Sequence, residues 1–143
     1  MTTINKSALV AYSPEQMFKL VDDIEAYAEF LPWCGKATEI YRHEDKVEAS
    51  LLISHSGLNK TFTTKNISER FAKIEMHLVD GPFKSLEGVW LFEALGDTAC
   101  KVSLNLEFEF SSKIIGLTLG PVFNKIANTL VDAFIKRAEV VYG

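Results

Sequence analysis

The sequence has few of the residues from which metal sites and disulfide frameworks are built. Its 143 residues include two cysteines and three histidines. Cys34 and Cys100 are far apart and show no metal-ligand spacing, so both are expected to be reduced, buried thiols. No P-loop, G-x-S-x-G elbow, H-E-x-x-H or C-x-x-C motif occurs. We therefore expect no metal, no catalytic residues and a protein that is not an enzyme.

Positive charge is not in excess either. Fifteen Lys and Arg residues stand against nineteen Asp and Glu residues, which gives a net charge of −4. Because electrostatic nucleic-acid binding requires a basic footprint, this balance argues against DNA as a partner. A local cluster of basic residues is still compatible with this net charge. Lys60, Lys65 and Arg70 lie near one predicted strand and are candidates for a basic patch, or for an ordinary solvated face.

Long apolar runs are missing as well. The longest, from Ile114 to Phe123, is interrupted by glycine and proline and is shorter than the ~20 residues that span a bilayer. Residues 1–10 lack the basic and then apolar pattern of a secretory signal. We expect a cytoplasmic protein. Hydrophobic residues at 48% and charged residues at 24%, with no repeat or linker, predict one globular domain over residues 1–143.

The N-terminal third predicts a strand followed by two short helices. Residues 3–11 are β-rich, and Ser13-Pro14-Glu15-Gln16 has the sequence of a helix start with a capping box. A second short helix is expected over residues 24–30 and ends at the following Leu-Pro. Asp23 in the Asp-Asp-x-Glu cluster is interpreted as its N-cap rather than as a catalytic or metal-binding carboxylate.

Alternation of apolar and polar residues predicts an antiparallel sheet in the middle of the chain. The segments 47–54, 60–67, 73–78, 86–95 and 100–110 carry it, the last most clearly. The C-terminal third changes to helical spacing over residues 123–141. A lead-in from Ser112 is expected, with Gly120-Pro121 as a break or kink and a flexible hinge at residues 116–120 as the alternative. The element order is that of an α+β fold.

Large apolar residues occur on both surfaces that must pack together. Aromatic side chains can hold a sheet and a helix apart and leave a cavity, or they can interdigitate into a solid core. The sheet face and the helix stripe consist of Trp90, Phe92, Leu104, Leu106, Phe108, Phe110, Phe123, Leu130 and Phe134.

Five motifs in order resemble those of the coenzyme Q-binding START-like family, within the polyketide cyclase/dehydrase and lipid transport superfamily. They are YSPEQMF (12–18), YAEFLPWC (27–34), GLNKTFTTKN (57–66), LVDGPFKSLEG (78–88) and FEF (108–110), followed by a helix that ends AFIKRAEVVYG. The likeness covers the whole chain and is greatest to the bacterial branch known as ribosome association toxin. It implies a helix-grip fold, a curved antiparallel sheet of about seven strands around a long C-terminal helix, with a hydrophobic cavity between them.

The resemblance implies two functions. The first is non-enzymatic binding of a hydrophobic lipid, ubiquinone above all, in support of respiratory electron transport, with possible transient contact at the inner membrane. The alternative is a toxin that binds the large ribosomal subunit and blocks 70S subunit association. No covalent or metal cofactor is implied.

The expected cavity lining is the set above together with Trp33. A quinone head group needs a hydrogen-bond donor, and Trp33, Trp90, Tyr27 and Ser or Thr hydroxyls are all candidates. Two loops combine apolar side chains with Pro or Gly and are expected at the entrance, or folded back as plugs over the core. They are Phe30, Leu31, Pro32 and Trp33, and Gly81, Pro82 and Phe83.

Overall fold

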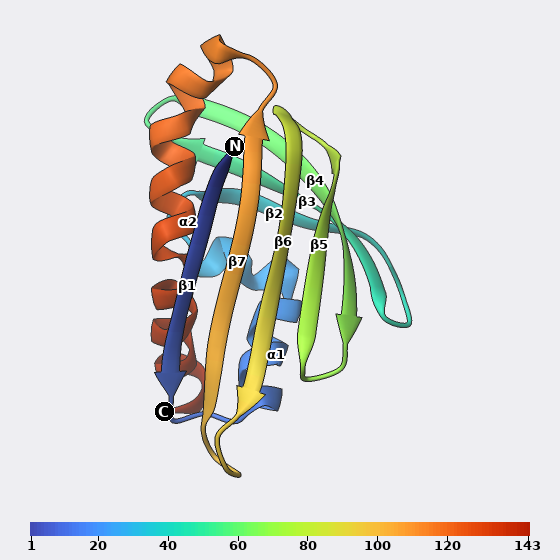
Figure 1. The fold of residues 1–143 in the computed structure, drawn as a ribbon, viewed down its shortest axis with the longest axis vertical. Helices are drawn as coiled ribbons and strands as arrows, with labels where there is room; N and C mark the ends of the chain where they lie inside the picture. Colours follow the sequence, from blue (N-terminus) through green and yellow to red (C-terminus); the bar gives the residue numbers. More distant parts are fainter.

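A computed structural model describes residues 1–143. One seven-stranded antiparallel sheet curves around a long C-terminal helix, which confirms the α+β helix-grip fold (Figure 1). The elements are β1 (Thr2–Val10), α1 (Pro14–Asp22), the 3-10 helix η1 (Ile24–Glu29), β2 (Cys34–His43), β3 (Lys46–His55), β4 (Leu58–Glu69), β5 (Lys73–Asp80), β6 (Phe83–Ala94), β7 (Cys100–Phe110) and α2 (Lys113–Tyr142).

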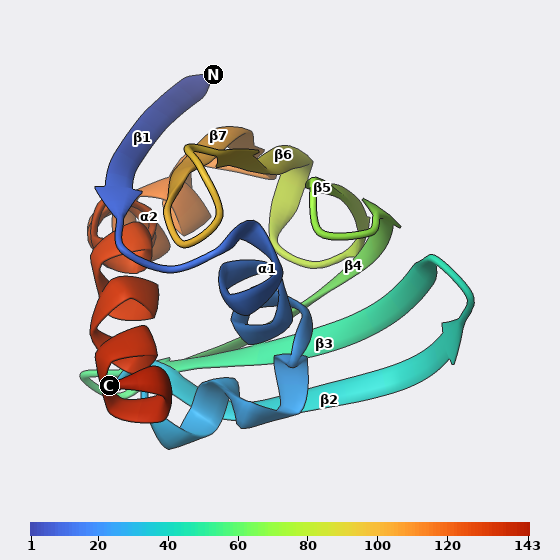
Figure 2. The same ribbon diagram turned by 90° about the horizontal axis from the view of Figure 1, so that it is seen from below.

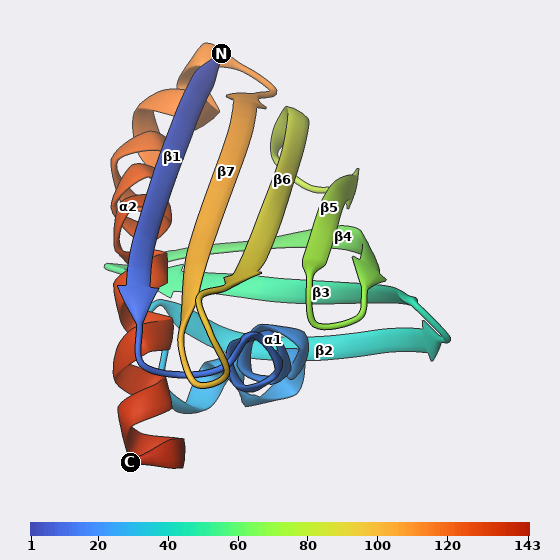
Figure 3. The same cartoon turned by 60° about the horizontal axis from the view of Figure 1, so that its bottom comes forward.

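The strand order β1-β7-β6-β5-β4-β3-β2 makes every strand after β1 a neighbour of the next in sequence. β1 instead pairs with β7, with Thr2 opposite Phe108 and Val10 opposite Cys100. The helices α1 and η1 connect the two edge strands, and Figure 2 shows α1 inside the curve of the sheet. In Figure 3, β2, β3 and β4 run at a steep angle to β1, β7 and β6. This bend creates the concave face that α2 and α1 cover.

The start of α1 is set by local sequence, as predicted. The Ser13 hydroxyl accepts from the Gln16 backbone N–H, and the Gln16 side chain accepts from the Ser13 backbone N–H. Asp23 occupies the N-cap position of η1, as predicted, but its side chain makes no capping hydrogen bond. The neighbouring Asp22 instead accepts from Arg42 of β2 at 3.0 Å. This contact therefore joins the end of α1 to β2.

The C-terminal helix is one continuous element rather than two separated at proline. It begins one residue after Ser112, whose hydroxyl accepts from the Ile115 N–H, and contains Pro121 within its length. Proline removes one main-chain donor and bends a helix, and the first turns of α2 lean over the end of the sheet in Figure 1. By length and composition alone α2 would qualify as a membrane span. One face of it is instead buried on the sheet.

Two aromatic clusters lie between α2 and the elements packed against it. Phe123 and Phe134, eleven residues or ~16 Å apart along the helix, each stand at the centre of one. Edge-on ring contacts with centroids 4.8–6.3 Å apart are favourable beyond their buried area. The rings nearest Phe123 are those of Phe108 at 4.8 Å and Phe83 at 4.9 Å. Those nearest Phe134 are Tyr27 at 5.3 Å, Phe30 at 5.3 Å and Trp90 at 5.4 Å.

Candidate functional site: an apolar cavity between the sheet and the C-terminal helix

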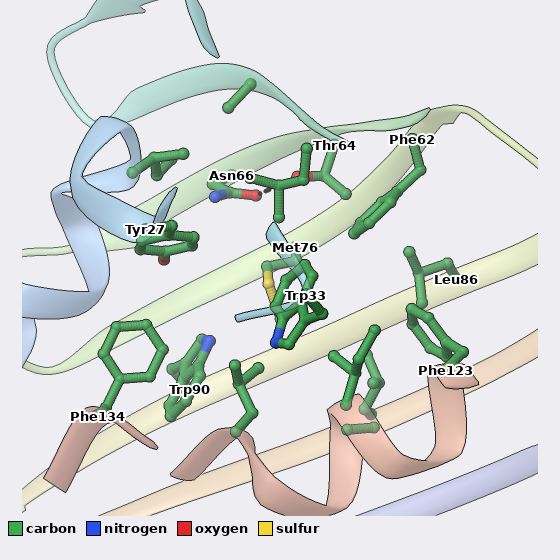
Figure 4. A pocket seen from close by; sticks show the side chains of 17 residues that line it. Tyr27, Trp33, Phe62, Thr64, Asn66, Met76, Leu86, Trp90, Phe123 and Phe134 are labelled. Atoms are coloured by element: carbon green, nitrogen blue, oxygen red, sulfur yellow. Dashed lines mark hydrogen bonds between the residues drawn. The ribbon is translucent and has the colours of Figure 1, made fainter. Parts of the chain in front are cut away.

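A cavity of about 80 Å³ lies between the two aromatic clusters. The middle of α2 forms one wall through Ile126, Ala127 and Leu130, and strands β3 to β7 form the other (Figure 4). Fifteen of its seventeen lining residues are hydrophobic. The full lining is Ile24, Tyr27, Trp33, Ala49, Leu51, Phe62, Thr64, Asn66, Met76, Leu86, Trp90, Leu106, Phe123, Ile126, Ala127, Leu130 and Phe134.

Six of the ten predicted lining residues are placed at this cavity. They are Trp33, Trp90, Leu106, Phe123, Leu130 and Phe134. The other four predictions need correction, because those side chains are core residues that do not reach it. Phe92 packs edge-on against Phe18 of α1, and Phe110 stacks on Phe83. Leu104 and Phe108 are fully buried elsewhere on β7. Sharing the inward face of the sheet is thus not sufficient, since the cavity occupies only the part of that face nearest the bend.

Two polar lining residues were missed by the sequence reasoning. Thr64 and Asn66 follow Phe62 at intervals of two on β4, so all three side chains point to the concave face. The signal was therefore present in TFTTKN as two polar residues in phase with a buried phenylalanine. Also missed were Ile24, Ala49, Leu51, Phe62, Met76, Leu86, Ile126 and Ala127, while Tyr27 was foreseen only as a donor.

Hydrogen bonding in the cavity leaves several donors unused. The Thr64 hydroxyl donates to Asn66 Oδ1 at 3.0 Å, while the Asn66 amide nitrogen has no partner within the protein. The indole N–H groups of Trp33 and Trp90 also make no hydrogen bond, and Figure 4 shows both nitrogens on the cavity side of their rings. The Tyr27 hydroxyl is already used, since it donates to the Val21 carbonyl. The cavity therefore offers free amide and indole N–H donors, together with the remaining acceptor lone pairs of the Thr64 and Asn66 oxygens.

The cavity has no group suited to acid–base chemistry. None of its lining residues is Asp, Glu, His, Lys or Arg. Burial raises the pKa of the Tyr27 phenol far above its ordinary value, and the negative charges of Asp22 and Asp23 raise it further. Tyr27 therefore stays neutral throughout the physiological range. This arrangement can hold a neutral molecule by apolar contact and by donation to its acceptors.

A surface groove of about 410 Å³ adjoins the cavity and shares Trp33 and Leu130 with it. Its other lining residues come from the η1–β2 segment and from α2: Phe30, Leu31, Pro32, Thr129, Asp132, Ala133, Lys136, Arg137 and Val140. Arg137 holds the two sides together, because it lies 4.9 Å from the Phe30 ring centroid and 3.6 Å from Glu29 Oε1. The segment 30–33 thus lines the groove beside the cavity, and its role as an entrance loop stays a prediction.

The second predicted entrance loop is a plug. Phe83 is buried, and its ring stacks on Phe110 at 5.3 Å. Neither Gly81 nor Pro82 lines the cavity or the groove. A side chain at Gly81 would lie 2.7 Å from Phe62 Cβ, which explains why this position in a tight, positive-φ turn holds glycine. The expectation of an entrance at residues 81–83 is therefore corrected.

The three cations of the predicted basic patch are not gathered into one surface. Lys60 and Arg70 are ten residues apart along β4 and the turn after it, or about 33 Å in an extended chain. Lys65 lies between them, opposite Glu48 on β3 and His77 on β5. The Arg70 guanidinium lies over the Phe71 ring at 4.8 Å. Their separation contradicts a compact patch, and their contact with a ribosome stays a prediction.

Comparison with known proteins adds a family and several relatives. The family described as "Polyketide cyclase / dehydrase and lipid transport" matches residues 10–135. The "Ribosome association toxin RatA" of Vibrio cholerae is 49% identical over 143 residues, which cover 100% of this chain and 99% of that protein. "Coenzyme Q-binding protein coq10, mitochondrial" of Schizosaccharomyces pombe is 27% identical over 94% of this chain and 85% of its own.

Among solved structures, the Zhui aromatase/cyclase from Streptomyces superposes with a TM-score of 0.83 at 16% identity. The match covers 96% of this chain and 93% of that one. At this identity the likeness shows the fold alone.

Proposed function

Because the chain belongs to the polyketide cyclase/dehydrase and lipid transport family, we propose that it binds a neutral hydrophobic ligand, ubiquinone or a similar isoprenoid quinone. The observation that carries the proposal is the set of unpaired N–H donors in an otherwise apolar cavity. Ligand pockets generally combine an apolar lining with a few polar groups that fix orientation. Here the ring would lie between β4–β6 and α2, near Asn66, Trp33 and Trp90.

The chemistry of the lining supports a quinone over other lipids. A fatty acid or a phospholipid carries a charge that no lining side chain is able to pair, and burying an unpaired charge is very costly. A pure hydrocarbon would leave the indole and amide donors without partners. Quinone carbonyls accept hydrogen bonds and carry no charge. A quinone therefore brings no unpaired charge into the cavity and supplies acceptors for the indole and amide donors.

The dimensions of the site require movement when a ligand binds. A cavity that admits benzene measures about 150 Å³, nearly twice the about 80 Å³ found here. The ring must displace flexible side chains such as Met76 and the half-buried Leu130. Because Leu130 and Trp33 also line the groove, we propose that the ligand enters there and that its tail lies along the groove.

Such a site favours exchange over permanent retention. Removing roughly 400 Å² of apolar tail from water contributes about 10 kcal/mol at ~25 cal/mol/Å². A tail that moves from a bilayer into the protein gains almost none of this free energy, since it was already out of contact with water. We therefore propose a carrier that supports respiratory electron transport without chemistry of its own and that touches the membrane transiently. The printed name of the coenzyme Q-binding relative is in keeping with this role.

Binding is tested with decylubiquinone, a short-tailed quinone, and with the Ala127→Leu variant. Ala127 is buried on the cavity wall of α2, so leucine there fills the space that the ring needs. The wild-type chain is expected to bind in the micromolar range or tighter, and the variant at least about tenfold more weakly. Equilibrium dialysis with chromatographic detection of the quinone measures both constants. Asn124→Leu, on the exposed face of the same helix, is the matched control and should bind as the wild type does.

The proposal also predicts a bound quinone in protein purified from its own host. Organic extraction followed by mass spectrometry should recover one in near-stoichiometric amount. Absence of decylubiquinone binding by a folded wild-type chain would overturn the proposed function.

A second candidate function follows from a different observation. A relative that is 49% identical over its whole length is named a ribosome association toxin. We propose on this ground that the chain binds the large ribosomal subunit and prevents formation of 70S ribosomes. Adding the purified protein to separated 30S and 50S subunits should lower the 70S peak on a sucrose gradient, with the protein in the 50S fractions. An unchanged 70S peak, with the protein remaining at the top of the gradient, argues against this function.

A further inference from the structure

The outward face of the first half of α2 is apolar and exposed. Over eighteen residues the helix is apolar enough to qualify as a membrane span, yet only 33% of that window is buried. Ile114 and Leu117 are 76% and 79% exposed, and Pro121 is exposed as well. Figure 1 shows α2 along one side of the molecule, with these turns at one end of it. Exposed apolar side chains that gather in this way indicate a surface that contacts a partner or a membrane.

The charge of this face is positive. No acidic residue occurs between Glu109 and Asp132, whereas Lys113 and Lys125 are both exposed. Glu109 is already engaged by Lys84 at 3.6 Å and by the N-terminal amine at 4.0 Å. The protein as a whole carries a net charge of −4, so its negative charge lies elsewhere. An anionic surface therefore attracts this face in preference to the rest of the molecule.

The polar side chains of this face already have partners within the helix. The Thr118 hydroxyl donates to the Ile114 carbonyl at 3.2 Å, and the Thr129 hydroxyl donates to the Lys125 carbonyl at 2.8 Å. The Asn128 amide donates to a carbonyl of the preceding turn at 2.8 Å. Because these protons are bonded to the helix, moving the side chains out of water costs less. The face is therefore suited to a medium less polar than water.

An anionic phospholipid surface fits these properties better than RNA or a second copy of the chain. RNA recognition commonly uses arginine and aromatic rings that stack on bases, and this face presents neither. A second copy would bring lysines against lysines, with no acid over residues 110–131 to pair them. The acyl boundary of a bilayer accepts Ile114 and Leu117, while the long lysine side chains reach the phosphates.

We propose that the outward face of α2 from Lys113 to Thr129 docks on membranes that contain anionic phospholipid. The inference rests on the proposed function for its purpose, since a carrier must reach the bilayer that holds its ligand. Thr129 also lines the groove, which shares Leu130 with the cavity. A ligand that leaves the docked membrane therefore meets the groove where the docking face ends.

Flotation with lipid vesicles tests the docking face without a quinone. The wild-type chain is expected to bind vesicles of equal phosphatidylcholine and phosphatidylglycerol at least about tenfold more tightly than vesicles of phosphatidylcholine alone. The preference should fall as salt is raised, because the screening length shortens from about 10 Å at 0.1 M to about 3 Å at 1 M. Equal binding to both kinds of vesicle, or binding to neither, would overturn this inference.

Paired variants locate the contact on α2. A basic residue near an anionic surface raises binding about fivefold, so Lys113→Gln combined with Lys125→Gln should weaken binding to the mixed vesicles by at least about tenfold. Lys46→Gln combined with Lys101→Gln is the matched control and should bind as the wild type does. It removes the same charge from exposed positions on the other face of the sheet. Leu117→Ser, at an exposed position, is expected to weaken binding to the mixed vesicles severalfold.

The outcomes separate this inference from both proposed functions. Wild-type binding to the mixed vesicles by the Lys113 and Lys125 variant would overturn it. If that variant also disappears from the 50S fractions of the sucrose gradient, the face belongs to the ribosome. Dialysis with decylubiquinone contains no membrane, so a failure there overturns the proposed quinone binding, whereas the vesicle result judges the docking face alone.

Discussion

Replacing Phe134 by aspartate is expected to abolish ligand binding and to lower the free energy of unfolding by at least about 4 kcal/mol at pH 8. The side chain is 1% exposed and lies against the rings of Tyr27, Phe30 and Trp90. Removing the ring loses these contacts and places a carboxylate among buried aromatic rings, which do not stabilise its charge. Denaturant unfolding and decylubiquinone dialysis measure the two effects.

The pH dependence of this variant identifies the buried charge as the cause. Burial favours the neutral acid, so the folded state holds its proton to a higher pKa than the unfolded chain, in which the pKa of aspartate is about 3.9. The folded state then binds more protons, and stability falls by about 1.4 kcal/mol per pH unit as pH rises between the two pKa values. At pH 5 the variant should thus recover part of its loss.

Phe134→Leu is the matched control for the charge. It removes the ring without adding a carboxylate, so its loss of stability should be smaller and should show no added pH dependence. If the Phe134→Asp variant is folded at pH 5 to 8 and binds decylubiquinone as tightly as the wild type, the cavity is not the ligand site.

Features fixed by neighbouring residues were predictable from the sequence. The capping box at Ser13 and Gln16 depends on contacts three residues apart, and it forms as expected. The alternation from Cys100 to Phe110 likewise identified β7 and its buried face. Asp23 shows the limit of a local rule, because it occupies the predicted N-cap position of η1 but makes no side-chain capping hydrogen bond. Its neighbour Asp22 is held by Arg42, which lies twenty residues further along the chain, and no capping rule includes that partner.

Which residues line the cavity depends on the curvature of the sheet, and the alternation of apolar and polar residues does not encode that curvature. A period of two assigns a residue to a face, whereas the bend of the sheet decides which residues of that face border open space. Register shifts in β2 between Cys34 and Lys36, and in β4 beside Thr63 and Thr64, contribute to this bend. Phe108 and Leu106 share one face of β7, yet only Leu106 reaches the cavity. The strand β2 itself gave no clear alternation, because it is an edge strand whose residues are largely exposed.

Substitution of Gly88 on β6 is the second change for which we expect a large effect on ligand binding. A Cβ at this position would lie 2.6 Å from Met76 Cε and 2.9 Å from Leu106 Cδ1, and both of these side chains line the cavity. Glycine within a strand weakens it, and it often marks a place where another group must approach closely. Gly88 therefore makes room for Met76 outside the space that the ligand would occupy.

Gly88→Ala is expected to weaken decylubiquinone binding by about tenfold, because Met76 and Leu106 must shift and the adjoining space is the cavity. Overpacking typically costs about 1–3 kcal/mol. In the empty protein Met76 and Leu106 are able to shift into the cavity, so the cost appears as weaker ligand binding. The free energy of unfolding of the empty protein should therefore change by less than about 1 kcal/mol. Gly116→Ala is the matched control, since a Cβ there meets Phe110 only at an ordinary 3.5 Å. It should leave binding unchanged.

Shortening Met76 in the same chain should reverse the effect of Gly88→Ala. Met76→Ala removes the side chain that the new Cβ displaces, so the double variant is expected to recover most of the wild-type affinity. The two substitutions are in contact, and their effects on binding should therefore be non-additive by about 1 kcal/mol or more in a double-mutant cycle. Additive effects would mean that Gly88→Ala acts through the strand and not through the cavity volume. Recovery would show that the ligand and the Met76 side chain compete for one space.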